Sequence, residues 1–243
     1  MITRIFLTIS VTVSCLGLAR ADDAKVEHGF LTRVHKDADG TEVKYVLFVP
    51  HDYKGDTPFP VILFLHGAGE TKGGQKMPVE VGIGPAIKKQ EKTFPFITII
   101  PQAQKRGWGA TTDNGKMAMA ILDELMKEYK TDPKRVYLTG LSMGGAGTWS
   151  FAITHPDRWA AIVPICGGGD PTKAAAIKDL PCWCFWGDAD APAKASMPKM
   201  IAAIKEAGGD PKFTEYPGVG HNSWDKAYAT KELFDWMMKQ ERK

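Results

Sequence analysis

The stretch Val136-Tyr137-Leu138-Thr139-Gly140-Leu141-Ser142-Met143-Gly144-Gly145 decides the fold predicted for this chain. Its first half reads as an apolar strand, and it leads directly into the pattern Gly-X-Ser-X-Gly and a segment that suits a helix. A serine on such a tight turn projects its hydroxyl above the sheet edge, and the flanking glycines let neighbouring backbone pass closely. Because chance alone produces many bare Gly-X-Ser-X-Gly matches, the rest of the sequence has to support this one.

A carboxylate and a histidine follow Ser142 in the order that such a turn requires. The strand-like run 180–186 ends in Gly187-Asp188-Ala189-Asp190, and His221 lies in a late loop before the last predicted helix. Serine is a weak nucleophile, so it needs an imidazole as base, and the imidazole needs a carboxylate to fix its tautomer. We therefore predict that Ser142, Asp190 and His221 form a catalytic triad.

Two other aspartates are alternatives to Asp190 as the acid of the triad. Asp190 fits the Gly-X-X-Asp spacing best, Asp188 lies in the same loop, and Asp170 follows the preceding predicted strand. Ser142 as an ordinary helix cap and His221 as a surface histidine are the non-catalytic readings of the other two positions.

Upstream, the buried-strand run 60–65 ends in His66-Gly67-Ala68-Gly69. This segment resembles the His-Gly loop of α/β-hydrolases, in which a backbone N–H joins the one after the nucleophile in an oxyanion hole. By that resemblance the donors are the N–H groups of Ala68 and Met143. His66 is more readily a structural residue, and Glu70 would support the loop through hydrogen bonds.

Taken together, these motifs resemble the α/β-hydrolase superfamily, in its small esterase branch. That branch includes phospholipase/carboxylesterase, dienelactone-hydrolase-like, polyhydroxybutyrate-depolymerase-like and feruloyl-esterase-like enzymes, and secreted peptidases of prolyl-oligopeptidase type. One departure from the pattern is Ala191-Pro192 after the acid, where such esterases often carry Val-Pro. The resemblance spans the chain from about residue 46 to its end, and it implies a serine hydrolase that needs no cofactor.

Alternation of strand-like and helical segments predicts an α/β fold, a three-layer sandwich around a mostly parallel sheet. Residues 30–35 and 43–49 are expected to form an antiparallel pair at one edge, and residues 224–239 a single closing helix. Only thirteen residues, 167–179, separate two predicted strands where many α/β-hydrolases insert a lid, so we expect an open cleft without a lid domain.

The irregular segment 69–82 lies beside the predicted oxyanion loop and is expected to shape the substrate pocket. The candidate pocket residues are His66, Trp108 and Trp224, the two tryptophans as aromatic walls.

The N-terminus has the composition of a secretory signal: Arg4, the apolar run 5–18 and the small-X-small site Ala19-Arg20-Ala21. We expect cleavage after Ala21, a secreted or periplasmic protein, and one catalytic domain over 22–243, with an uncleaved anchor as the alternative. The remaining chain would carry 29 basic and 28 acidic residues, a net charge of +1. This balance gives no case for nucleic acid or an anionic membrane surface as partner.

Three cysteines would remain after cleavage: Cys166, Cys182 and Cys184. Cys182 and Cys184 share one strand face, where packing as small buried residues is favoured over a disulfide. Neither a Cys-X-X-Cys pair nor a Cys/His ligand spacing is present, so no metal site is predicted.

The sequence therefore predicts a serine carboxylesterase that acts on small or polysaccharide-linked esters. A secreted serine peptidase is the closest alternative, because the same triad cleaves amides. A non-catalytic binding protein with a hydrolase fold is the third.

Overall fold

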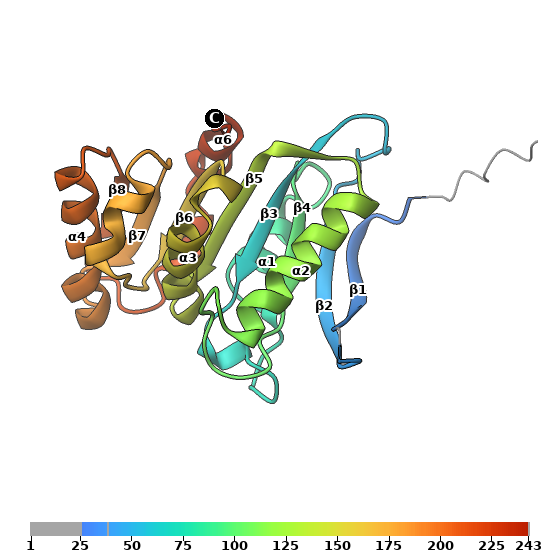
Figure 1. Cartoon of the computed structure of the whole chain (residues 1–243), viewed down its shortest axis with the longest axis horizontal. Helices are drawn as coiled ribbons and strands as arrows, with labels where there is room; N and C mark the ends of the chain where they lie inside the picture. Colours follow the sequence, from blue (N-terminus) through green and yellow to red (C-terminus); the bar gives the residue numbers. More distant parts are fainter. Residues whose placement is uncertain (1–25, 38, 243) are drawn as a thin grey trace, which may run out of the picture.

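The computed structural model describes residues 26–37 and 39–242, which form one eight-stranded sheet with helices on both faces (Figure 1). The predicted signal segment 1–21 lies outside the described residues and stays a prediction. The strands are β1 Gly29–Lys36, β2 Glu42–Val49, β3 Phe59–Leu65, β4 Ile97–Pro101, β5 Thr131–Leu141, β6 Ala161–Ile165, β7 Trp183–Gly187 and β8 Lys212–Tyr216. The α-helices are α1 Ile83–Lys89, α2 Asp113–Glu128, α3 Met143–Thr154, α4 Ala191–Glu206, α5 Trp224–Tyr228 and α6 Glu232–Met238; the 3-10 turns are η1 Ala68–Glu70, η2 Pro78–Glu80, η3 Pro156–Arg158 and η4 Pro171–Ile177.

The strand order is β1-β2-β4-β3-β5-β6-β7-β8. β1 pairs antiparallel with β2 and β2 with β4, as expected for the sheet edge, and the remaining neighbours are parallel. Parallel strands need covered faces, and β3, β4 and β6 are accordingly almost continuous buried apolar runs. In Figure 1, α2 and α3 cover the near face, and α1 lies behind the sheet.

Parallel pairing brings the carboxyl ends of β3, β5, β6 and β7 to one edge of the sheet. The segments that leave these ends carry Ala68, Ser142, Cys166 and Asp190. Ligand sites of open α/β sheets lie at this edge, so the topology places all the chemistry-bearing loops together.

The prediction of a single closing helix over 224–239 is wrong. The structure has two short helices, α5 and α6, separated at Ala229-Thr230-Lys231. The Thr230 hydroxyl contacts both the Lys226 carbonyl, at 3.1 Å, and the Tyr216 hydroxyl, at 2.8 Å. Such side-chain bonds compete with the helical pattern, and here they fasten the break to β8.

The short connection between β6 and β7 holds only the 3-10 turn η4, so the described chain has no inserted lid at this point. No helix among the described residues is long and apolar enough to cross a membrane.

Candidate active site

Ser142 lies at the sharp turn between β5 and α3. Its backbone has φ 53° and ψ −114°, a conformation that side-chain-bearing residues rarely adopt. The Ser142 N–H donates to the Ile165 carbonyl at 2.9 Å, and this bond ties the turn to β6. Strain of this kind costs on the order of 1–3 kcal/mol and persists where the surroundings enforce it, often at functional positions.

The glycines around Ser142 are required by close backbone packing. A Cβ atom at Gly144 would lie 1.8 Å from the Leu65 carbonyl oxygen, and one at Gly140 would lie 2.4 Å from the Gly144 oxygen. Both contacts are with backbone, which cannot swing aside. The Gly-X-Ser-X-Gly pattern is therefore set by the approach of α3 to β3 and β5.

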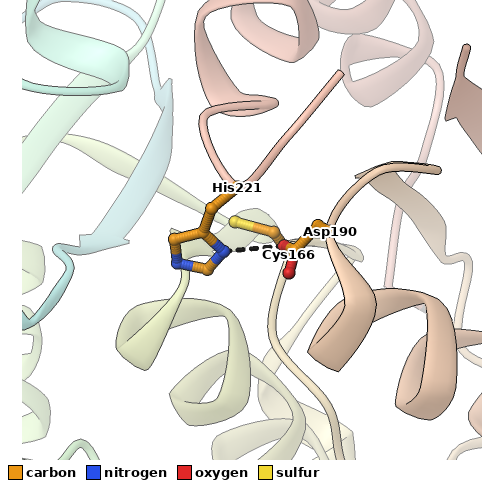
Figure 2. A group of neighbouring side chains, drawn as sticks. All are labelled: Cys166, Asp190 and His221. Atoms are coloured by element: carbon orange, nitrogen blue, oxygen red, sulfur yellow. Dashed lines mark hydrogen bonds and ion pairs between the residues drawn. The ribbon is translucent and has the colours of Figure 1, made fainter. Parts of the chain in front are cut away.

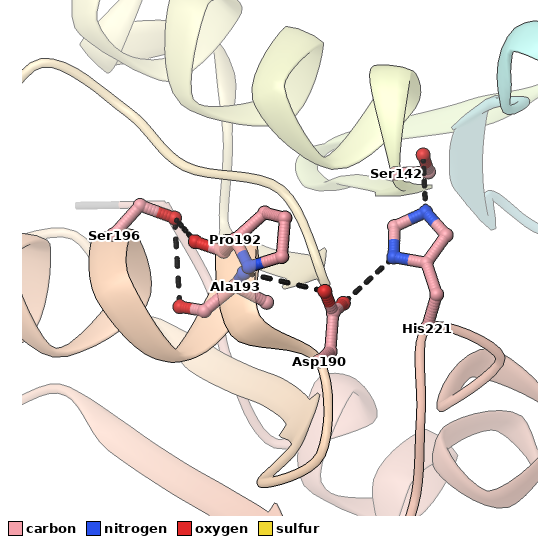
Figure 3. A network of polar contacts seen from close by, with 6 residues as sticks. All are labelled: Ser142, Asp190, Pro192, Ala193, Ser196 and His221. Carbon is pink, nitrogen blue, oxygen red and sulfur yellow. Dashed lines mark hydrogen bonds and ion pairs between the residues drawn. The ribbon is translucent and has the colours of Figure 1, made fainter.

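His221 and Asp190 complete a line of hydrogen bonds from Ser142 (Figure 3). The Ser142 Oγ lies 2.8 Å from His221 Nε2, and His221 Nδ1 lies 2.7 Å from Asp190 Oδ2. A carboxylate accepts hydrogen bonds, so the ring proton belongs on Nδ1 and leaves Nε2 as an acceptor for the serine hydroxyl. The structure thus brings together the three residues that the sequence picked out.

Asp190 is held in place as the N-cap of α4. It is only 4% exposed, and its Oδ1 accepts a long, 3.4 Å bond from the Ala193 N–H. Pro192 stands in the first turn of α4, where a missing N–H costs nothing.

The other two acids have different partners. Asp188 accepts from the Gly218 N–H at 2.7 Å, and Asp170 caps η4 by accepting from the Thr172 N–H and hydroxyl. Of the three candidate acids, Asp190 is the one hydrogen-bonded to His221.

Ala68 and Met143 each occupy the first position of a helical segment, η1 and α3 respectively. The N–H groups of a first helical turn have no intrahelical acceptor, so both are available to an external oxygen. The positive end of the α3 dipole adds to this at Met143.

His66 and Trp108, two of the three pocket candidates, lie in the interior beneath the Ala68 loop. His66 is fully buried, donates from Nδ1 to the Gly67 carbonyl at 2.6 Å and accepts at Nε2 from the Ala103 N–H at 3.0 Å. The Trp108 indole N–H donates to the His66 carbonyl at 3.0 Å. Burial lowers the pKa of His66 to about 4, against the opposing effect of the Gly67 carbonyl. These side chains hold the loop and do not line the groove.

Trp224, the third pocket candidate, lines a groove of about 1000 Å³, whose lining includes Gly69 and Asn222, the sequence neighbours of Ala68 and His221. Its ring meets the His221 ring edge-on with centroids 5.6 Å apart. One wall comes from η1, the 75–82 segment and α1, and the opposite wall from α5 and α6. The irregular segment 69–82 thus forms part of this groove, and its role in shaping the substrate pocket stays a prediction. The wall formed by α5 and α6 was not expected from the sequence.

Cys166 is a neighbour of the triad that sequence reasoning missed (Figure 2). It is buried, has φ 42°, and its Sγ lies within 4.8 Å of both a His221 nitrogen and an Asp190 oxygen. Only the β6–β7 geometry reveals this, because a lone cysteine after a strand carries no motif.

The Cys166, Asp190 and His221 side chains do not fit a metal ion. The 2.7 Å bond between His221 and Asp190 is shorter than the separation of roughly 3.3 Å between two ligands about 2.0–2.1 Å from a tetrahedral zinc. Burial also raises the pKa of the Cys166 thiol to about 12, whereas a metal binds the thiolate. Cys182 and Cys184 are likewise buried and free, with sulfur atoms 3.4 Å apart, in accord with packing as small apolar residues.

Comparison with known proteins gives a consistent picture. The family model named Esterase matches residues 38–210, which is well over half of the chain. A solved structure of a thermostable esterase superposes with a TM-score of 0.77 and 33% identity, covering 88% of this chain and 63% of that one.

Two curated relatives match shorter segments. Poly(3-hydroxyalkanoate) depolymerase C of Paucimonas lemoignei is 31% identical over 152 residues, which cover 53% of this chain and 34% of the relative. The bifunctional acetylxylan esterase/xylanase XynS20E of Neocallimastix patriciarum is 33% identical over 137 residues, 54% of this chain and 19% of the relative. The match therefore spans about a third or less of each relative's length. With the family match and the sheet order in agreement, the chain belongs to the Esterase family of the α/β-hydrolase superfamily.

Proposed function

We propose that this protein is a serine carboxylic-ester hydrolase that works through an acyl-enzyme. The observation that carries the proposal is the continuous line of short hydrogen bonds from Ser142 through His221 to the buried Asp190. Membership of the Esterase family supports ester hydrolysis, and the geometry supports the serine mechanism.

In the first step, the Ser142 oxygen attacks the ester carbonyl while its proton passes to His221 Nε2. Asp190 stabilises the imidazolium that forms and holds the ring in place. His221 then gives the proton to the leaving alcohol. Water repeats the sequence on the acyl-enzyme, releases the acid and restores Ser142.

The tetrahedral oxyanion would be bound by the N–H groups of Ala68 and Met143. Both are backbone groups at helix starts, fixed before substrate arrives, so little reorganisation accompanies the reaction. Loss of one such donor typically costs about 3 kcal/mol in the barrier.

For substrate, we propose small or polysaccharide-linked esters. The absence of a lid between β6 and β7 in the described chain leaves the triad accessible: the His221 side chain is 51% exposed. An accessible site suits soluble and polymer-borne esters. The acetylxylan esterase among the relatives is named for an ester on a polysaccharide, which supports this choice.

The test is hydrolysis of p-nitrophenyl acetate, butyrate and octanoate by the wild type and by Ser142→Ala. We expect fast turnover of the short esters by the wild type and a loss of at least a thousandfold in the variant, with unchanged thermal unfolding. Ser196→Ala is the matched control: this hydroxyl lies on α4 and bonds the Pro192 carbonyl at 2.8 Å (Figure 3).

Labelling by a fluorophosphonate probe, present in the wild type and absent in Ser142→Ala, would separate an active serine hydrolase from a non-catalytic fold. Turnover of peptide amides in preference to every ester would replace the esterase assignment by the peptidase alternative. Activity above a thousandth of wild type in purified Ser142→Ala would contradict the assigned nucleophile.

A further inference from the structure

The connection between β4 and α2, residues 102–112, holds the loop that carries the first proposed oxyanion donor. The Ala103 N–H donates to His66 Nε2 at 3.0 Å, on the N-terminal side of that donor. The Gln102 side-chain amide donates to the Glu70 carbonyl, also at 3.0 Å, on its C-terminal side. The connection therefore fastens the loop at both ends of η1.

The same connection also contacts α3, whose first residue, Met143, supplies the second proposed donor. The Gly107 N–H donates to the Met143 Sδ atom at 3.1 Å. The Ala110 N–H donates to the Ser150 Oγ atom at 3.1 Å, about two turns further along α3. One irregular segment thus touches both sides of the proposed oxyanion hole, so its conformation bears on the spacing of the two donors.

Asn114, in the first turn of α2, holds this irregular segment in one conformation. Its side chain is buried, with 7% of the residue exposed. The Oδ1 atom accepts from the Gln104 N–H at 2.9 Å. The Nδ2 group donates to the Lys105 carbonyl at 2.8 Å and to the Gly107 carbonyl at 2.7 Å. Backbone groups outside helices and strands need partners, and here one fully hydrogen-bonded side chain supplies three.

We propose that Asn114 is a positioning residue for the oxyanion hole, which acts by fixing residues 104–107 and through them the N–H groups of Ala68 and Met143. This inference rests on the proposed esterase function and deepens it. Oxyanion donors are effective only at about 2.7–3.1 Å from the developing charge, so a small displacement weakens them. Asn114 does not line the groove beside Trp224, so its effect falls on the transition state and not on ester binding.

The first variant is Asn114→Ala, assayed with p-nitrophenyl acetate. Complete loss of one oxyanion donor costs about 10²–10³ in kcat, and a displaced donor costs part of that. We expect kcat per active site to fall about tenfold or more, while KM stays within about twofold of wild type. Active sites are counted by complete labelling with a fluorophosphonate probe, so that unfolded protein does not enter the rate.

Inhibition by a trifluoromethyl ketone separates the oxyanion hole from a general loss of structure. The Ser142 oxygen bonds to the ketone carbon, the serine proton passes to His221, and the carbonyl oxygen becomes the anion that the hole would bind. The Ki should rise in Asn114→Ala by the factor by which kcat/KM for the ester falls. A purely structural role would lower the number of labelled sites and leave the Ki unchanged.

Thr112→Ala is the matched control at the same end of α2. The Thr112 hydroxyl caps the helix by accepting from the Gly115 N–H and donates to the Gly109 carbonyl, outside residues 104–107. Loss of such a cap costs about 1 kcal/mol of stability. Both kcat per active site and the Ki should therefore stay within about twofold of wild type.

Gln102→Ala is a second variant, which removes only the bond to the Glu70 carbonyl. It should lower kcat and raise the Ki in the same sense as Asn114→Ala, and it decides the matter if Asn114→Ala does not fold. Unchanged kcat and Ki per labelled site, a fall in kcat with an unchanged Ki, or a rise in KM at constant kcat would overturn the proposal. Turnover and labelling of the wild type test the esterase function itself, so the two failures are distinguishable.

Discussion

Two histidines beside the same site, His66 and His221, show how surroundings assign a role to one side chain. His66 is fully buried and bonded through both ring nitrogens to backbone, the Gly67 carbonyl and the Ala103 N–H. His221 has a side chain that is half exposed, with one nitrogen on Asp190 and the other on Ser142. Backbone partners fix a ring as scaffold, whereas a carboxylate on one side and a hydroxyl on the other prepare it to move a proton.

The regions that supply the two rings differ in the same way. His66 follows a central strand, and the Trp108 ring meets its ring edge-on at 5.0 Å. His221 stands in a loop between β8 and α5, at the surface. Rigid support therefore lies beneath the proposed oxyanion donors, and the proposed base comes from the solvent-accessible side.

Replacing His221 should have the largest effect of the substitutions that test this comparison. His221→Gln removes the base, and we expect kcat for p-nitrophenyl acetate to fall at least about a thousandfold. The free energy of unfolding should change by no more than about 0.5 kcal/mol, because the side chain is half exposed. Steady-state kinetics and denaturant unfolding check both parts, with His155→Gln at the end of α3 as control. A variant retaining a tenth of the activity would show that another group acts as base.

The burial of His66 should make the free energy of unfolding depend on pH. Its pKa is about 4 in the folded protein and 6.5 without burial, so the unfolded chain binds the extra proton between these values. The fold should therefore lose stability as pH falls from 6.5 towards 4, by about 2–3 kcal/mol from this residue at pH 4.5. Stability at higher pH is unaffected by this proton.

Urea unfolding of the wild type and His66→Gln at pH 7.5 and 4.5 isolates this contribution, since other titrating groups are common to both proteins. The wild type should lose about 2–3 kcal/mol more than the variant. Equal losses would mean that His66 becomes protonated without hindrance, contrary to its burial.

Trp108→Phe should have the smallest effect. The substitution removes the indole N–H and leaves the buried His66 carbonyl without that donor, at a cost of about 1–2 kcal/mol in unfolding free energy. KM for p-nitrophenyl butyrate should remain within about twofold, because the ring is 2% exposed and lies outside the groove. A large rise in KM with unchanged stability would instead show that Trp108 contacts the substrate.

Much of the site was predictable because its signals are local. The Gly-X-Ser-X-Gly pattern is itself a local signal, and the strand-to-helix turn predicted at Ser142 agrees with the structure. The order of serine, acid and histidine follows from strand ends meeting at one edge of a parallel sheet. The sequence-based predictions failed where contacts between distant parts of the chain determine the structure. The Tyr216 hydroxyl bonds Thr230 at the break in the predicted closing helix, and Trp108, expected in the pocket wall, is buried in the interior.

The amino-acid sequence by itself determined the strand–turn–helix around Ser142, the α/β class and the identity of the residues near the proposed chemistry. Periodicity and glycine placement encode these features within short windows of chain. Tertiary structure alone decided between Asp190 and Asp188, placed Cys166 beside His221 and Asp190, and formed a groove from segments 69–95 and 222–238. These outcomes depend on burial and on partners far away in the chain, which no local pattern records.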